Sequence, residues 1–169
     1  VTRVVATARK RLSVVAGAGS NDTRHAAELA ALAHKAKADG LLVVTPYYNK
    51  PTQAGIVAHF RAVIAAAPLP VILYNIPSRT QSDLLPESIA RLAEHAQVVA
   101  IKEASGSVSR ATEILRLLGE RLTVLAGDDA LALPLYSVGA QGVVSVLSNI
   151  APAWMLALGA GRHVSQCVF

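Results

Sequence analysis

Short aliphatic runs recur along the chain and alternate with segments that have helical periodicity. Each run is nearly continuous in Val, Ile, Leu and Ala, which is typical of a strand buried on both faces of a parallel sheet. We therefore predict six strands, at residues 12–16, 41–45, 71–74, 98–101, 122–126 and 142–146.

The segments between these runs have the features of helices. Apolar residues between positions 22 and 38 form one helical stripe, with Asn21 suited to an N-cap and Gly40 to a stop. Five later helices are predicted: over 52–66 behind a Thr52 cap, over 86–95 with Pro86 in the first turn, after Ser107, over 130–136 behind Asp128, and from about 151 with Pro152 in the first turn.

The chain is thus a βα unit repeated six times, and this alternation predicts a parallel α/β fold. An open doubly wound sheet and a closed (β/α)8 barrel both fit the pattern. Six strands do not close an ordinary eight-stranded barrel. If the fold is a barrel, this chain therefore forms only part of it.

Composition narrows the function classes. Of 169 residues, 53% are hydrophobic and 16% charged, with a net charge of +5. The basic residues are scattered and their one cluster, at 9–11, has no interleaved aromatic residue, so we expect no nucleic-acid binding. No apolar run reaches the roughly 18 residues needed to span a bilayer, so no membrane partner is expected. The single cysteine, Cys167, fits a reducing, cytoplasmic setting.

Polar side chains gather where the predicted strands end, which is the edge that carries the site in parallel α/β folds. Lys102 directly follows the aliphatic residues 98–101, on the same strand face as Val98 and Ala100. Apolar surroundings favour the neutral amine, which can attack a ketone and form an imine. Alternatively, Lys102 snorkels to solvent or pairs with Glu103.

Three further residues at strand exits could serve such a lysine. Tyr74 could lie beside Lys102 and move protons, or it could be a packed aromatic residue. Arg79 offers a planar fork for a carboxylate, or it could pair with Asp83 at the surface. Tyr48 lies in a loop where its ring is hard to bury, and it could also contact another subunit.

Two other patterns give weaker signals. Asp128 and Asp129 stand without a histidine or third carboxylate at ligand spacing, so they predict helix capping and no metal site. Gly17 and Gly19 resemble part of a dinucleotide fingerprint, but the third glycine and the acidic residue are missing. We therefore expect neither a metal nor a nucleotide cofactor.

Taken together and in order, these motifs resemble the dihydrodipicolinate synthase/N-acetylneuraminate lyase family over about residues 12–155. The matching stretches are TPYYNKPT at 45–52, YNIPSRT at 74–80, IKEASG at 101–106, GDDA at 127–130 and GVVSV at 142–146. Members of the family are (β/α)8 barrels that form a Schiff base with pyruvate. The resemblance implies a partial barrel whose six βα units correspond to units three to eight.

Arg79 and the Tyr47–Tyr48 pair resemble the dihydrodipicolinate synthase branch of the family. That branch condenses pyruvate with L-aspartate-4-semialdehyde to 4-hydroxy-tetrahydrodipicolinate, on the route to diaminopimelate and lysine. The resemblance makes Lys102 the imine lysine and Tyr74 the proton donor and acceptor. It makes Tyr48 a relay residue that reaches across a subunit interface into the site of a neighbouring subunit in a homo-oligomer.

The same resemblance assigns binding roles. Arg79 would bind the carboxylate of the semialdehyde, and the backbone of Val144 would contact pyruvate. Asn21 and Tyr47 match a pocket where family enzymes bind lysine as an inhibitor, and His25 stands where lysine-sensitive members often have Glu. We therefore expect weak or absent inhibition by lysine.

The resemblance does not cover the whole family pattern. The first two βα units, with a Gly-Thr-Thr-Gly-Glu loop, have no counterpart here, so we expect a truncated chain. We expect residues 1–158 to form an incomplete barrel domain and 159–169 an atypical tail. Two alternatives remain: a different pyruvate aldolase of the same superfamily, and a catalytically inactive fragment that acts only in subunit association.

Overall fold

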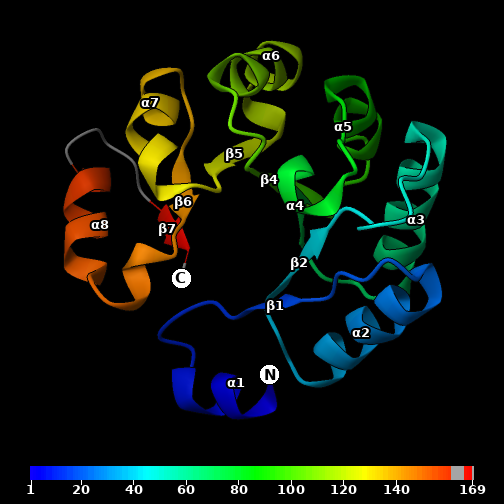
Figure 1. Ribbon diagram of the computed structural model, residues 1–169. Coiled ribbons are helices and arrows are strands. Elements are labelled where there is room, and N and C mark those ends of the chain that lie inside the picture. The colour runs from blue at the N-terminus through cyan, green and yellow to red at the C-terminus, as the bar shows by residue number, and fades with distance from the viewer. Residues whose placement is uncertain (161–165, 169) are drawn as a thin grey trace.

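The computed structural model describes residues 1–160 and 166–168, and its centre is a curved sheet of seven parallel strands (Figure 1). The strands pair in the order in which they occur along the chain. They are β1 Val15–Gly17, β2 Gly40–Val44, β3 Val71–Asn75, β4 Val98–Glu103, β5 Thr123–Ala126, β6 Gly142–Val144 and β7 Gln166–Val168.

Helices occur between the strands, and the longer ones lie around the outside of the sheet (Figure 1). They are α1 Thr2–Ala8, α2 Thr23–Lys35, α3 Gln53–Ala66, α4 Pro77–Thr80, α5 Pro86–Leu92, α6 Val108–Leu118, α7 Ala132–Ser137 and α8 Pro152–Ala160, with short 3-10 turns η1 Gly119–Arg121, η2 Asp129–Leu131 and η3 Leu147–Asn149. None of the helices in the described part of the chain combines the length and apolar character that a membrane crossing requires.

The strand order decides between the two architectures that the sequence left open. In a doubly wound sheet the order reverses at a switch point, and helices cover both faces. Here the order runs from β1 to β7 without a reversal, and the longer helices lie on one side. This is the winding of a (β/α)8 barrel, and among the described residues no pairing closes β7 onto β1. The prediction of a partial barrel is confirmed.

Both faces of the sheet are apolar, which explains the continuous aliphatic runs. The outer face packs against the helices through residues such as Leu73, Ile101 and Val124. The inner face carries a small cluster of strand residues, made of Ile72, Ala100 and Leu125 with Val15, Leu42 and Val144 against it. Because each strand buries both of its faces, polar side chains are confined to the strand ends.

Most of the helix N-caps predicted from the sequence are present in the structure. Thr52, Ser107 and Asp128 each accept a hydrogen bond from a backbone N–H of the helical turn that follows, as predicted. The prediction of Asn21 as a cap was wrong, since the Asp22 side chain accepts the hydrogen bond from the N–H of His25. The two residues are adjacent and equally suited to the role, so the sequence alone could not separate them.

Three elements were not predicted. Both α1 and α4 are short, and β7 comes from a tail that matches no recognised pattern. Strand β7 pairs with β6 in parallel register, from Gly142 opposite Gln166 to Val144 opposite Val168. The remainder of the predicted tail, residues 161–165 and 169, lies outside the described residues.

The interface between α2 and α3 contains a buried histidine that makes the stability of the fold depend on pH. His59 is 3% exposed, and its Nδ1 lies 2.9 Å from the hydroxyl of Thr23. Burial lowers the pKa of His59 below its ordinary value of 6.5, and the charge of Asp22 only partly opposes this.

We predict that the free energy of unfolding decreases as the pH falls below about 6.5. The unfolded chain binds a proton there while the folded chain resists it, so the slope for this one group reaches at most about 1.4 kcal/mol per pH unit. Urea unfolding of the protein and of His59→Gln, measured across this range, tests the idea. An equal slope in both proteins would contradict it.

Candidate active site

The two residues at the centre of the site lie on neighbouring strands at the carboxyl edge of the sheet. Tyr74 of β3 is directly opposite Lys102 of β4 in the parallel register. Each stands two residues beyond a member of the inner cluster, Ile72 and Ala100, so both side chains belong to the inner face. The Lys102 Nζ atom lies over the Tyr74 ring, 4.1 Å from its centroid.

Lys102 is held in surroundings that favour its neutral form. Its side chain is buried, with 9% exposure, and burial lowers the pKa of the amine, while the charge of Asp129 partly opposes this shift. The two alternatives for Lys102 do not describe it. The side chain does not snorkel into solvent, and Glu103 points to the outer face, where it accepts hydrogen bonds from Ser105 and Asn75.

One detail of the strand prediction was wrong. Val98 packs in the outer cluster, whereas Ala100 packs in the inner one, so the two residues do not share a face. The cause is a register shift: Val71 pairs with Val98, but the next residue of β3, Ile72, pairs with Ala100. The extra residue, Val99, is exposed, as expected for a bulge.

Tyr74 remains a phenol at neutral pH. Burial raises its pKa, and the nearby positive charge of Arg79 offsets only part of that rise. A protonated hydroxyl can donate a proton to a reacting oxygen or nitrogen, and can take it back later. Tyr74 and Lys102 therefore form an acid and a base whose surroundings move their pKa values in opposite directions.

Arg79 opens onto the same region. It lies in α4, directly after β3, and lines a cleft of about 460 Å3 together with Tyr74 and Tyr47. The alternative of an ion pair with Asp83 is wrong, because Arg110 of α6 binds both carboxylate oxygens of Asp83 at 3.0 Å. In the part of the chain that the structure describes, no carboxylate pairs with Arg79.

The side chain of Tyr48 lies in solvent. Its side chain is 86% exposed, and its backbone adopts φ 74°, a conformation rare for a bulky residue. One backbone hydrogen bond supports this conformation: the Tyr48 N–H donates to the carbonyl of Thr80 at 3.0 Å. The structure therefore does not bring Tyr48 together with Tyr74 and Lys102 within one chain.

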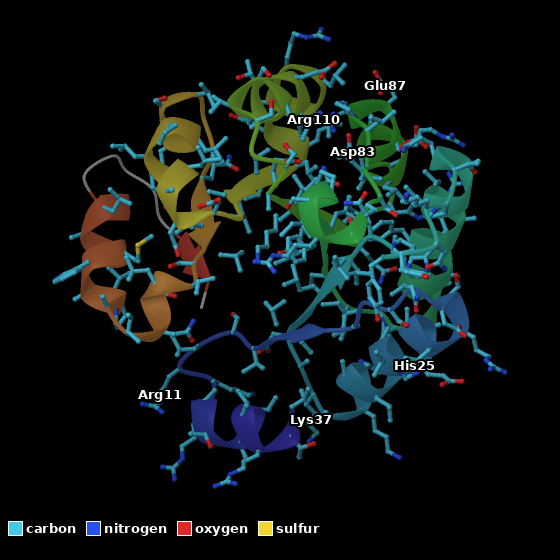
Figure 2. All side chains as sticks on the ribbon, in the orientation of Figure 1. Arg11, His25, Lys37, Asp83, Glu87 and Arg110 are labelled. Carbon is cyan, nitrogen blue, oxygen red and sulfur yellow. The ribbon has the colours of Figure 1, made fainter. Side chains whose placement is uncertain are left out.

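The other candidates lie around the same edge. Val144 ends β6 and packs against the inner cluster. The carbonyl of Asn21 accepts a hydrogen bond from the Asn49 side chain at 2.9 Å. His25 is exposed on α2 at the periphery of the molecule (Figure 2), and its Nδ1 lies 3.7 Å from Oε2 of Glu28.

The two weaker motifs have structural roles. Asp128 caps the following turn, as predicted, while Asp129 accepts hydrogen bonds from the N–H groups of Val146 and Leu147 at 3.1 and 2.8 Å. Gly19 lies so close to β2 that a Cβ would come within 2.5 Å of Val44, which explains a glycine there by packing. No group of three metal-ligating side chains occurs within 1–160 and 166–168.

Sequence reasoning missed one residue that shapes the Lys102 pocket. A Cβ on Gly127, at the exit of β5, would lie 2.6 Å from the Cβ of Ala104 and 3.1 Å from the Cε of Lys102. The end of β4 and the stem of Lys102 together therefore leave no room for a larger residue at this position. A glycine directly after an aliphatic strand was the signal, and its meaning depends on which strand lies alongside.

Comparisons with known proteins agree with this geometry. A family model described as the dihydrodipicolinate synthetase family matches residues 1–160. A 4-hydroxy-tetrahydrodipicolinate synthase from Geotalea daltonii is 54% identical over 155 residues, which are 92% of this chain and 53% of the relative. The chain thus spans about half the length of the curated relatives it matches.

Solved structures give the same result. Chloride-inhibited dihydrodipicolinate synthase from Acinetobacter baumannii, complexed with pyruvate, matches with a TM-score of 0.91 and 42% identity, over 98% of this chain and 58% of that one. The lysine-bound enzyme from Cyanidioschyzon merolae matches with a TM-score of 0.89 and 45% identity, over 98% and 57%.

We predict that Gly127→Ala lowers the reactivity of the Lys102 amine. The added methyl group must displace the lysine stem or the Ala104 backbone, and overpacking of this kind costs about 1–3 kcal/mol. Competitive acetylation read by mass spectrometry measures the reactivity of Lys102. The control is Gly55→Ala, whose methyl group would meet only ordinary contacts at 3.4 Å or more. Equal acetylation of Lys102 in both variants would count against the steric argument.

Proposed function

The chain belongs to the dihydrodipicolinate synthetase family, and from that premise we propose that it takes part in the pyruvate-dependent condensation for which its relatives are named. One observation carries the proposal: a buried lysine places its amine over the ring of a half-buried tyrosine at the carboxyl edge of parallel strands. The substrates would be pyruvate and L-aspartate-4-semialdehyde, and the product 4-hydroxy-tetrahydrodipicolinate.

The first half of the proposed reaction is imine formation. The neutral amine of Lys102 attacks the ketone carbon of pyruvate, and a proton moves to the carbonyl oxygen, which then leaves as water. Tyr74 is placed to supply and recover that proton. No cofactor is needed, because the covalent imine on Lys102 itself withdraws electrons from the pyruvate carbons.

The second half joins the two substrates. Loss of a methyl proton turns the imine into an enamine, whose carbon attacks the aldehyde of the semialdehyde. The amino group of that substrate then attacks the imine carbon, closes the ring and releases Lys102. The whole sequence consumes one pyruvate and one semialdehyde and releases one water.

The other residues are assigned by position. The guanidinium of Arg79 opens onto the cleft beside Tyr74, where it can hold the carboxylate of the semialdehyde. The backbone of Val144 would contact pyruvate from the inner face.

We propose in addition a cytoplasmic homo-oligomer in which Tyr48 contributes to the site of a neighbouring copy. The 86% exposure of its side chain and its positive φ support this role, because both are costly for an aromatic ring with no partner.

Borohydride trapping tests the imine. We predict that pyruvate with borohydride leaves a reduced adduct on Lys102, found by peptide mass spectrometry, and that Lys102→Arg abolishes it. Lys35→Arg, on α2, is the matched control and should trap as the unaltered protein does. An adduct elsewhere, or none in folded protein, would refute the role of Lys102.

The unreduced imine also separates the possible aldehydes. When an aldehyde is added with pyruvate before the borohydride, the semialdehyde should deplete the trappable imine faster than sugar-acid aldehydes do. A faster reaction with the sugar-acid aldehydes would indicate a different pyruvate aldolase.

We also propose that L-lysine binds weakly or not at all at the positions of Asn21, His25 and Tyr47, which the family resemblance assigns to a lysine site. A histidine cannot pair with the ammonium group of the ligand as a carboxylate can. We predict that His25→Glu tightens lysine binding roughly tenfold, as expected for one charge-assisted hydrogen bond. Calorimetric titration measures this, with His34→Glu at the other end of α2 as the control. Tight binding by the unaltered protein would overturn the proposal.

A further inference from the structure

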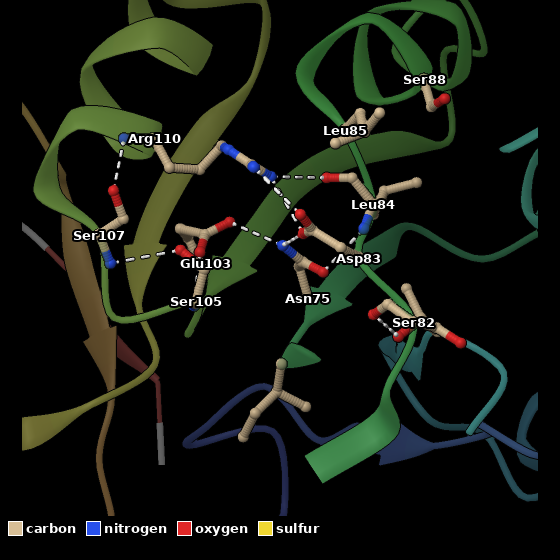
Figure 3. Close-up of polar contacts among 12 residues, drawn as sticks. Asn75, Ser82, Asp83, Leu84, Leu85, Ser88, Glu103, Ser105, Ser107 and Arg110 are labelled. Carbon is tan, nitrogen blue, oxygen red and sulfur yellow. Dashed lines mark hydrogen bonds and ion pairs between the residues drawn. The ribbon is translucent and has the colours of Figure 1, made fainter. Parts of the chain in front are cut away.

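A polar cluster made of Asn75, Asp83, Glu103 and Arg110 joins β3, β4 and α6 (Figure 3). Asn75 and Glu103 are opposite each other, one residue beyond the Tyr74–Lys102 pair in the same register. Alternation along the strands turns these two residues outward. They are 0% and 2% exposed, so their polar groups depend on partners within the protein.

Asn75 is the centre of this cluster. Its Nδ2 donates to Glu103 Oε2 at 3.3 Å and to Asp83 Oδ1 at 3.1 Å, and its Oδ1 accepts from the N–H of Leu84 at 3.0 Å. Asn75 thereby joins β3 to β4 at the level of the site. The guanidinium of Arg110, in α6, donates to both carboxylate oxygens of Asp83 and so connects the cluster to α6.

The same hydrogen bonds close the loop that carries Arg79. Residues 76–83 leave β3, form α4 and return to Asn75 through Asp83 and Leu84. Arg79 lies in the middle of this closed loop. One amide side chain therefore touches the strand of Tyr74, the strand of Lys102 and both ends of the Arg79 loop.

Hydrogen-bond donors of the protein face both carboxylate oxygens of Glu103. Its Oε1 accepts from the Ser105 N–H at 2.6 Å, and its Oε2 accepts from Asn75, so both oxygens face donors. Burial raises the pKa of Glu103, and the donors and the charge of Arg110 work against that rise. Because each oxygen accepts from a different N–H group, the carboxyl group is held in one orientation.

We propose that Asn75 is a positioning residue that fixes the spacing of Lys102, Tyr74 and Arg79 from the outer face of the sheet. It touches no substrate and acts through the strands that carry the three side chains. The inference rests on the proposed function, because the spacing of these three side chains matters only if they carry out the proposed reaction. Reacting groups must be held closely, and a displacement of about 1 Å can cost on the order of a hundredfold in rate.

The test compares Asn75→Ala with Gln97→Ala. Gln97 is the matched control, since it is a part-buried amide at the opposite end of β4 that donates to the carbonyls of Ile64, Ala67 and Leu69. Both variants should lose stability. Only Asn75→Ala should admit water at Lys102, move the acetylation profile of its amine toward the ordinary pKa of 10.5 and slow pyruvate trapping by roughly tenfold or more.

The outcomes separate cleanly. If Asn75→Ala and Gln97→Ala show the same acetylation profile and trapping rate, Asn75 is structural only and the proposal is overturned. If the unaltered protein traps no pyruvate, the proposed function fails, yet the acetylation profiles still decide whether Asn75 sets the surroundings of Lys102. Should Asn75→Ala not fold, Arg110→Lys, which keeps the charge and loses the fork, must shift the profile in the same direction.

Discussion

The register of β3 against β4 is the constraint on which the site depends. It places Tyr74 opposite Lys102 on the inner face and Asn75 opposite Glu103 on the outer face. Because side chains alternate along a strand, a slip of one residue in β4 would carry the lysine to the helical side and bring the glutamate into the site. The chemistry at this edge is therefore decided by backbone pairing as much as by the residues themselves.

Burial then shifts the protonation equilibrium of each of these groups. The same loss of water lowers the pKa of Lys102 and raises the pKa of Tyr74, so the amine moves toward its neutral form while the phenol keeps its proton. Glu103, buried behind them, is supplied with donors that compensate for the lost water. The aliphatic strands thus act on the site electrostatically as well as by holding it.

Much of this arrangement could be predicted from the sequence, because it follows from local periodicity. The aliphatic runs located the strands, and a lysine directly after one of them was bound to lie at the carboxyl edge. The pairing of Asp83 with Arg110 could not be predicted, since the two residues are 27 positions apart and meet only through the packing of α6. The bulge at Val99 was missed for a related reason: its cause is the register with β3, which one strand alone does not reveal.

Gly127 has a consequence for how this edge of the sheet can change over time. A methyl group there would meet the Cβ of Ala104 at 2.6 Å, and both the carbonyl oxygen of Glu103 and the Cε of Lys102 at 3.1 Å. The lysine stem is thus one of three groups against this position, and the other two belong to the end of β4 itself. A descendant that abandoned the lysine for a shorter side chain would still meet Ala104 and the Glu103 carbonyl here. The glycine would therefore be kept after the nucleophile was lost, because it records how closely the ends of two strands approach.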